Sequence, residues 1–117
     1  MSGIPRQELL RSMYEAFNAR DVDTCLAAMT PDVDWANGWK GGRVVGRDAV
    51  RDYWQRQWAE IDSIAEPTAI SERPDGTIEV AVHLVARDKT GKLLSDGESL
   101  HVYEFRGNLV ERMTIDN

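Results

Sequence analysis

The fold of this chain is decided by residues 98–115, which read ESLHVYEFRGNLVERMTI. Apolar and polar side chains alternate on both sides of Gly107-Asn108, and this dipeptide is a turn signal. We therefore predict two strands, Glu98–Arg106 and Leu109–Ile115, joined by a tight turn. Strands joined in this way pair antiparallel and form a hairpin.

The length of this turn decides which side chains share a face. With a two-residue loop, Arg106 lies opposite Leu109 and His101 lies opposite Thr114. One face then carries His101, Tyr103, Arg112, Thr114 and Asp116. The other face carries Leu100, Val102, Leu109, Met113 and Ile115, which we expect to form a dimer surface. A three-residue loop would instead remove Arg112 and Asp116 from the pocket face.

The rest of the chain divides into helical and extended segments. Apolar side chains recur at helical spacing in three regions, namely Arg6–Asn18, the segment carrying Val22, Cys25, Leu26 and Met29, and Ala49–Ile61. The extended segments are Val33–Trp35, Val44–Val45, Thr68–Arg73, Thr77–Arg87 and Leu93–Leu94. The pattern predicts one α+β domain over residues 1–117, in which an antiparallel sheet curls against the helices. A strongly curved sheet can leave a cavity on its buried side.

Bulk properties exclude several classes of function. The net charge of −6 disfavours nucleic acid and anionic membrane surfaces, because both attract clustered Lys and Arg. No segment approaches the ~20 apolar residues of a membrane span. Residues 1–6 lack the apolar run of a signal peptide, so we expect a cytoplasmic protein. The lone cysteine, Cys25, is interpreted as a small buried side chain on a helix.

Four segments in order resemble a known family. They are Tyr14–Asp23, Met29–Trp35, Gly46–Trp54 and Val102–Glu111. Their sequences resemble the SnoaL-like and ketosteroid-isomerase-like branch of the nuclear transport factor 2 superfamily. The resemblance implies three helices on a curved, mostly antiparallel sheet that forms a cone around an apolar pocket. It also implies homodimerisation through the outer face of the sheet.

The resemblance argues against ketosteroid isomerase chemistry. That reaction uses a carboxylate base, with a tyrosine and a protonated aspartic acid as the oxyanion hole. By local spacing these roles fall on Asn37, Met13 and His101, and none of the three has the required residue type. A shift of one residue would bring Tyr14 or Asp34 into play, but it would not restore all three roles.

The polyketide cyclases of this superfamily offer a closer match. They resemble this chain in having a histidine on the penultimate strand and an acid near the end of the last strand, here His101 and Asp116. A carboxylate beside an imidazole sets its tautomer and favours its protonated form, so the pair can move protons. The alternative is that His101 is a satisfied wall histidine and Asp116 an ordinary terminal residue.

Aromatic side chains are the second candidate feature. We expect them to line a pocket for a flat hydrophobic ligand, with core packing as the alternative. The candidates are Phe17, Trp35, Trp39, Tyr53, Trp54, Trp58 and Tyr103. Polar groups that could contact substrate oxygens are Tyr14, Asn37 and Arg112. His83 is a further candidate, although the pattern does not tell which face of its strand looks inward.

These features lead to one function and two alternatives. We expect an enzyme without cofactor that acts on a small hydrophobic molecule by proton transfer, as cyclases, isomerases, dehydratases and hydrolases do. A non-catalytic binding domain of the same fold is the first alternative. A homodimeric protein-interaction module is the second. No metal is expected, because the two histidines lack the spacing of metal ligands.

Overall fold

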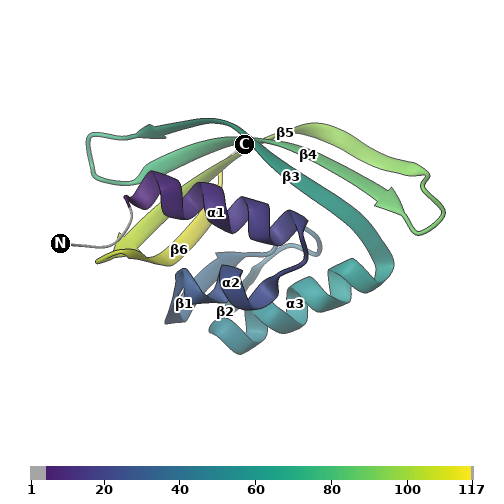
Figure 1. The fold of residues 1–117 in the computed structure, drawn as a ribbon, viewed down its shortest axis with the longest axis horizontal. Helices are drawn as coiled ribbons and strands as arrows, with labels where there is room; N and C mark the ends of the chain where they lie inside the picture. Colours follow the sequence, from purple (N-terminus) through teal and green to yellow (C-terminus); the bar gives the residue numbers. More distant parts are fainter. Residues whose placement is uncertain (1–4, 117) are drawn as a thin grey trace.

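The computed structural model describes residues 5–116, in which three helices cover one face of a curved six-stranded sheet (Figure 1). The helices are α1 (Arg6–Asn18), α2 (Val22–Ala27) and α3 (Arg47–Glu60). The strands are β1 (Met29–Ala36), β2 (Arg43–Val45), β3 (Ile61–Glu72), β4 (Ile78–Asp88), β5 (Leu93–Arg106) and β6 (Leu109–Ile115). Their order is β2-β1-β6-β5-β4-β3, and β1 pairs parallel with β6 while the other pairs are antiparallel. The predicted α+β class with a curved, mostly antiparallel sheet is confirmed.

Helix α1 occupies the predicted residues and turns its apolar stripe toward the sheet. Leu10, Met13 and Tyr14 are buried on this stripe, which is the arrangement expected of an amphipathic helix on a core. The largest fully buried side chains lie between the helices and the concave face of the sheet: Tyr103, Leu10, Met29, Ile78 and Val33. Within residues 5–116, no helix is long and apolar enough to cross a membrane.

The ends of the other two helices differ slightly from the prediction. The Asp21 side chain caps α2 by accepting a hydrogen bond from the Thr24 N–H at 3.3 Å. Met29 begins β1 instead of completing that helix. Helix α3 follows Gly46, whose φ of 94° suits glycine, and it stops before Ile61.

Strand β3 is longer than predicted because Pro67 does not interrupt it. The strand starts directly after α3 and continues through Pro67 to Glu72. The pairing with β4 shifts register between Pro67 and Ala69, and β3 lies at the edge of the sheet. Proline is tolerated at edge strands and bulges because it removes only one ladder hydrogen bond there. The prediction of two separate strands within Leu93–Arg106 is also wrong, since these residues form one strand.

The β5–β6 hairpin contains a bulge that the turn chemistry did not predict. Arg106 pairs with Leu109, as a two-residue loop requires, but the register then shifts between Glu104 and Phe105. Glu111 is therefore the extra residue on β6. After it, Tyr103 pairs with Met113 and His101 pairs with Ile115. The predicted pairing of His101 with Thr114 is wrong.

The bulge exchanges the two faces of β6, because a slip of one residue turns every later side chain over. Met113 and Ile115 face the helices, so they do not belong to the outer surface where we expected them. Arg112, Thr114 and Asp116 leave the face of His101. The outer face of β5 keeps half-buried Leu100 and Val102.

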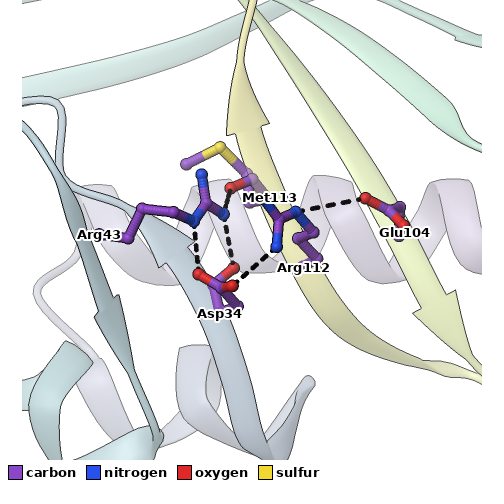
Figure 2. A network of polar contacts seen from close by, with 5 residues as sticks. All are labelled: Asp34, Arg43, Glu104, Arg112 and Met113. Carbon is purple, nitrogen blue, oxygen red and sulfur yellow. Dashed lines mark hydrogen bonds and ion pairs between the residues drawn. The ribbon is translucent and has the colours of Figure 1, made fainter.

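On the outer face, Arg112 joins a network of polar contacts that spans four strands (Figure 2). Arg112 Nη1 contacts Asp34 Oδ2 at 2.8 Å, and its Nε lies 3.6 Å from Glu104 Oε2. Arg43 Nε donates to Asp34 Oδ1 at 2.5 Å, and its Nη2 donates to the Met113 carbonyl at 2.7 Å. Asp34 therefore accepts from strands on both sides of β1 and stabilises the parallel β1–β6 pairing.

We predict that Asp34→Ala lowers the free energy of unfolding by about 1–2 kcal/mol, because two guanidinium groups lose a half-buried shared acceptor. Asp52→Ala is the matched control, since Asp52 forms an exposed ion pair with Arg56 within α3 and should cost less than about 0.5 kcal/mol. Urea unfolding at neutral pH measures both variants. Equal losses in the two would show that the network does not hold the sheet.

Candidate functional site

A cavity of about 240 Å³ lies between the concave face of the sheet and the helices. Its walls come from α1, α3, the end of β1 and strands β3–β6. The lining is mainly apolar and aromatic, and within the described residues it contains no Asp, Glu, Lys or Arg. Of the predicted ligand contacts, those that line it are Tyr14, Phe17, Trp35, Trp39, Tyr53, Trp54 and Tyr103, together with the predicted catalytic residue His101.

Three buried polar side chains meet at the wall of this cavity. The Tyr14 hydroxyl on α1 lies 2.8 Å from His101 Nδ1 and 2.6 Å from the Tyr103 hydroxyl. His101 and Tyr103 point to the same face because they are two residues apart on β5. All three side chains are less than a tenth exposed, so their hydrogen bonds are made inside the protein.

Counting hydrogens fixes the direction of this chain of hydrogen bonds. Tyr103 is fully buried, and Tyr14 is the only hydrogen-bond partner of its hydroxyl among the described residues. If Tyr103 donates to Tyr14 and Tyr14 donates to His101 Nδ1, both hydroxyl hydrogens have an acceptor. The reverse direction would leave the Tyr103 hydrogen unpaired in the core, which is costly. The favoured tautomer of His101 therefore carries its proton on Nε2.

Burial controls the protonation of all three groups. Desolvation lowers the pKa of His101 to about 4, so the imidazole is neutral at physiological pH. Desolvation likewise raises the pKa of Tyr14 and of Tyr103, so both phenols keep their protons. The chain of hydrogen bonds is thus uncharged.

The aromatic wall is continuous from this polar chain to α3. The Trp35 ring lies 6.0 Å from the Tyr103 ring and 5.4 Å from the Trp54 ring, in edge-on geometry. Phe17 meets Trp54 at 5.2 Å. Trp58 lies behind this wall, packed on Phe17 at 5.2 Å, and it is not among the cavity-lining residues. Edge-to-face packing of this kind stabilises a rigid apolar surface.

Two predicted ligand contacts have structural partners elsewhere. Asn37 folds the glycine-rich loop, because its side-chain oxygen accepts from the backbone N–H groups of Trp39 at 3.0 Å and Lys40 at 2.8 Å. Arg112 lies on the outer face in the network described above. Neither residue lines the cavity, so these two predictions are corrected.

The expected His101–Asp116 pair does not form. The Asp116 side chain is 60% exposed and lies 3.7 Å from Arg73, beyond the bulge that turned it outward. His83 also faces away from the cavity, where its Nε2 contacts Asp96 Oδ1 at 2.6 Å. The hydrogen bond with Asp96 raises the pKa of His83. Histidine and carboxylate are therefore paired on this sheet, but on the outer face and with other residues.

Several cavity residues were missed from sequence. The periodicity of α1 places Met13 in the core stripe, and the sequence patterns do not single out Gln57, Ser63 or Ser95. Ser63 and Ser95 lie in segments of β3 and β5 that were not predicted as strands. Extending the predicted strand from Pro67 back to Ile61 puts Ile61, Ser63 and Ala65 on one face, since side chains alternate along a strand. This alternation is the signal that places Ser63 on an inward face.

No group of three or more His, Cys, Asp or Glu in residues 5–116 is arranged to hold a metal ion. The thiol of Cys25 is buried, donates to the Met13 carbonyl at 3.4 Å, and has its pKa raised by desolvation to about 12. A thiol that stays protonated is a poor nucleophile.

Residues 10–113 match the SnoaL-like domain family in sequence. The chain belongs to this family. The match spans both the helices and the strands that build the cavity, so the family and the cavity are properties of the same domain. No protein with a curated description matches the chain in sequence.

Solved structures similar to this SnoaL-like chain support the fold. One is a nuclear transport factor 2-like protein of unknown function from Burkholderia pseudomallei, with a TM-score of 0.82 and 24% identity over 95% of this chain and 88% of that one. Another is a candidate polyketide cyclase from Xanthomonas campestris, with a TM-score of 0.76 and 24% identity over 94% of this chain and 87% of that one. A third is TerC co-crystallised with polyporic acid, with a TM-score of 0.83 and 20% identity over 97% of this chain and 91% of that one.

We predict that His101 makes the protein less stable in acid. Because the pKa of His101 falls from 6.5 to about 4 on folding, the unfolded chain binds more protons than the folded protein between these values. The stability contributed by the neutral imidazole is complete above pH 6.5 and declines as the pH falls, by about 3 kcal/mol at pH 4. Urea unfolding of wild type and His101→Gln at pH 7 and pH 4 measures this difference.

His83→Gln is the control for that measurement. The pKa of His83 is raised by Asp96, so its contribution has the opposite sign and is lost as the pH rises. A stability difference between wild type and His101→Gln that does not change with pH would contradict the buried neutral imidazole.

Proposed function

We propose that this protein binds a small, uncharged, hydrophobic carbonyl compound in the cavity and promotes proton transfer at the carbon next to the carbonyl group. One observation carries the proposal, namely the chain of hydrogen bonds from Tyr103 through Tyr14 to His101 Nδ1. Because these hydrogen bonds occupy Nδ1, the Nε2–H group of His101 is the donor available to a ligand in the cavity that His101 lines. A carbonyl oxygen is the matching acceptor.

The chemistry follows from where charge develops. When a carbon acid loses its proton, the negative charge moves to the neighbouring carbonyl oxygen and an enolate forms. A fixed donor in an apolar site stabilises such an oxyanion more than water does. The proton passes to a solvent base and can return at another carbon, which is isomerisation. The enolate carbon can instead attack a second carbonyl carbon of the same molecule, whose C=O double bond opens and whose oxygen takes up the proton from solvent; this step is cyclisation.

His101 therefore acts as the donor to oxygen in this proposal, and not as half of a His–Asp base pair. The tautomer with the proton on Nε2 presents no lone pair to the ligand. Tyr14 and Tyr103 are positioning residues, because they hold His101 in that tautomer without touching the ligand oxygen themselves. The aromatic wall of Trp35 and Trp54 supplies the apolar surface for the body of the ligand.

A binding domain without catalysis is the second candidate. It is favoured by the absence of an ionised carboxylate among the described lining residues, because a strong base for a carbon acid is then missing from the site. The same donor and aromatic wall would select the same ligand class. The two candidates differ only in whether proton exchange accompanies binding.

We predict that 2-tetralone, a small bicyclic ketone, binds and exchanges its α-protons with deuterated solvent faster in the presence of the protein. NMR measures the exchange, and calorimetry measures the affinity. In His101→Leu the catalysed exchange should fall about 100-fold, since one oxyanion donor is lost. His83→Leu is the matched control and should exchange like wild type, because His83 lies on the outer face.

The outcomes of this experiment distinguish the enzyme from the non-catalytic binding domain. Binding that depends on Trp35, without accelerated exchange, would support the non-catalytic domain and overturn the enzyme. Absence of binding at millimolar ketone would overturn both. Equal exchange in wild type and His101→Leu would remove His101 from the mechanism.

We also propose that the protein is a homodimer formed through the outer face of the sheet. Leu100 and Val102 are half-buried on this face of β5, and Leu100 pairs with Ala81 of β4. A second copy would cover these apolar side chains. Light scattering at micromolar concentration should report a dimer for wild type and a monomer for Val102→Glu. A wild-type monomer would contradict this surface.

A further inference from the structure

Ser63 is a polar side chain at the cavity that has no role in the hydrogen-bond chain of Tyr103, Tyr14 and His101. It lies on β3, lines the cavity, and is 9% exposed. Its hydroxyl is buried and makes no hydrogen bond to any described part of the protein. Buried hydroxyls almost always have a partner, so an unpaired one in a cavity wall indicates a partner supplied from outside.

The register of the sheet separates Ser63 from His101. Ser63 pairs with Ala86 of β4, and Ala86 pairs with Ser95 of β5. His101 pairs with Val80, six residues from Ala86 along β4. This is ~20 Å along an extended strand, but the sheet curves around α1 (Figure 1). Tyr14, which contacts His101, and Asn18, which contacts Ala65, are four residues apart on α1, about 6 Å along the helix axis, so the two ends lie much closer across the cavity than along the strand. The two polar groups therefore belong to different ends of one cavity.

The backbone around Ser63 is held firmly by the end of α1. Arg20 Nη1 donates to the Ser63 carbonyl at 2.7 Å. The Asn18 amide donates to the Ala65 carbonyl at 2.8 Å and accepts from the Ala65 N–H at 2.9 Å. Since these contacts and the pairing with Ala86 of β4 fix the backbone, rotation about χ1 is the freedom left to the Ser63 hydroxyl, and it turns between three staggered positions.

The other polar groups at this end are neutral as well. Gln57 reaches the cavity from α3 and Ser95 from β5. No lining residue of the described chain carries a carboxylate, an ammonium or a guanidinium group. A charged ligand group would stay unpaired here, whereas a hydroxyl or carbonyl group can exchange hydrogen bonds with Ser63.

We propose that the ligand is an elongated, mostly apolar molecule with an oxygen at each end, and that Ser63 determines specificity by binding the second oxygen. This inference rests on the proposed function, since His101 holds the first oxygen. The hydroxyl of Ser63 rotates toward the cavity when the ligand arrives and gains the partner that it lacks in the free protein. The second oxygen belongs to an uncharged hydroxyl or carbonyl group.

The test compares 2-tetralone with 6-hydroxy-2-tetralone, which carries a hydroxyl at the end opposite the ketone. Calorimetry should show that wild type binds the hydroxy compound about tenfold more tightly, as one neutral hydrogen bond provides. In Ser63→Ala this preference should disappear, so that both ketones bind with similar affinity. Ser71→Ala is the matched control on β3, because Ser71 faces outward and contacts Glu79.

A second measurement asks whether Ser63 has only a structural role. Because its hydroxyl has no partner in the free protein, Ser63→Ala should melt at the same temperature as wild type or higher. A clear fall in melting temperature would show that the hydroxyl has a partner within the protein and would overturn the inference.

The outcomes separate this inference from the proposed function. If 2-tetralone binds normally and wild type shows no preference for the hydroxy compound, Ser63 has no role in specificity and only this inference fails. If neither ketone binds, the proposed function fails first. A preference that persists in Ser63→Ala would assign the second oxygen to another residue and overturn the inference.

Discussion

The site depends on the register of β6, which the ion pair between Arg112 and Asp34 secures. One extra residue, Glu111, turns Arg112 outward to Asp34 at 2.8 Å and turns Met113 inward to the cavity. After the bulge, polar and apolar side chains alternate along β6, so only the face with the apolar side chains can pack on the core. The bulge therefore decides at one point which side chains of β6 face the cavity.

The consequence is a cavity that no charged side chain of residues 5–116 lines. Asp116 leaves the pocket with the outer face of β6, so His101 finds a tyrosine as its partner in place of a carboxylate. Desolvation then keeps the imidazole neutral, and the hydrogen count of two buried phenols directs its proton to Nε2. With no acid beside it, His101 keeps a proton on Nε2, and in the proposed function it donates this proton in a hydrogen bond to the ligand instead of acting as the base that the sequence predicts.

Polar groups at separate ends of an apolar cavity restrict the ligands that can bind to those with matching polar groups. In the proposed function, the end at His101 offers a hydrogen to a ligand oxygen, and the end at Ser63 has a hydroxyl with no hydrogen-bond partner in the described protein. Between them, Trp35 and Trp54 form a rigid aromatic wall. Such a site distinguishes ligands strongly by their polar groups and weakly by the size of their apolar part. The reason is that a buried polar group left without a partner costs more binding free energy than a missing methylene group.

The sequence by itself determined the α+β class, helix α1, the β5–β6 turn at Gly107-Asn108 and most aromatic residues of the cavity. These follow from local periodicity and turn chemistry, which involve neighbours along the chain. Only the tertiary structure decided the bulge, the outward position of Asp116 and the inward position of Ser63. A bulge forms where packing on both faces of a sheet is best satisfied, and that balance depends on strands and helices distant in sequence.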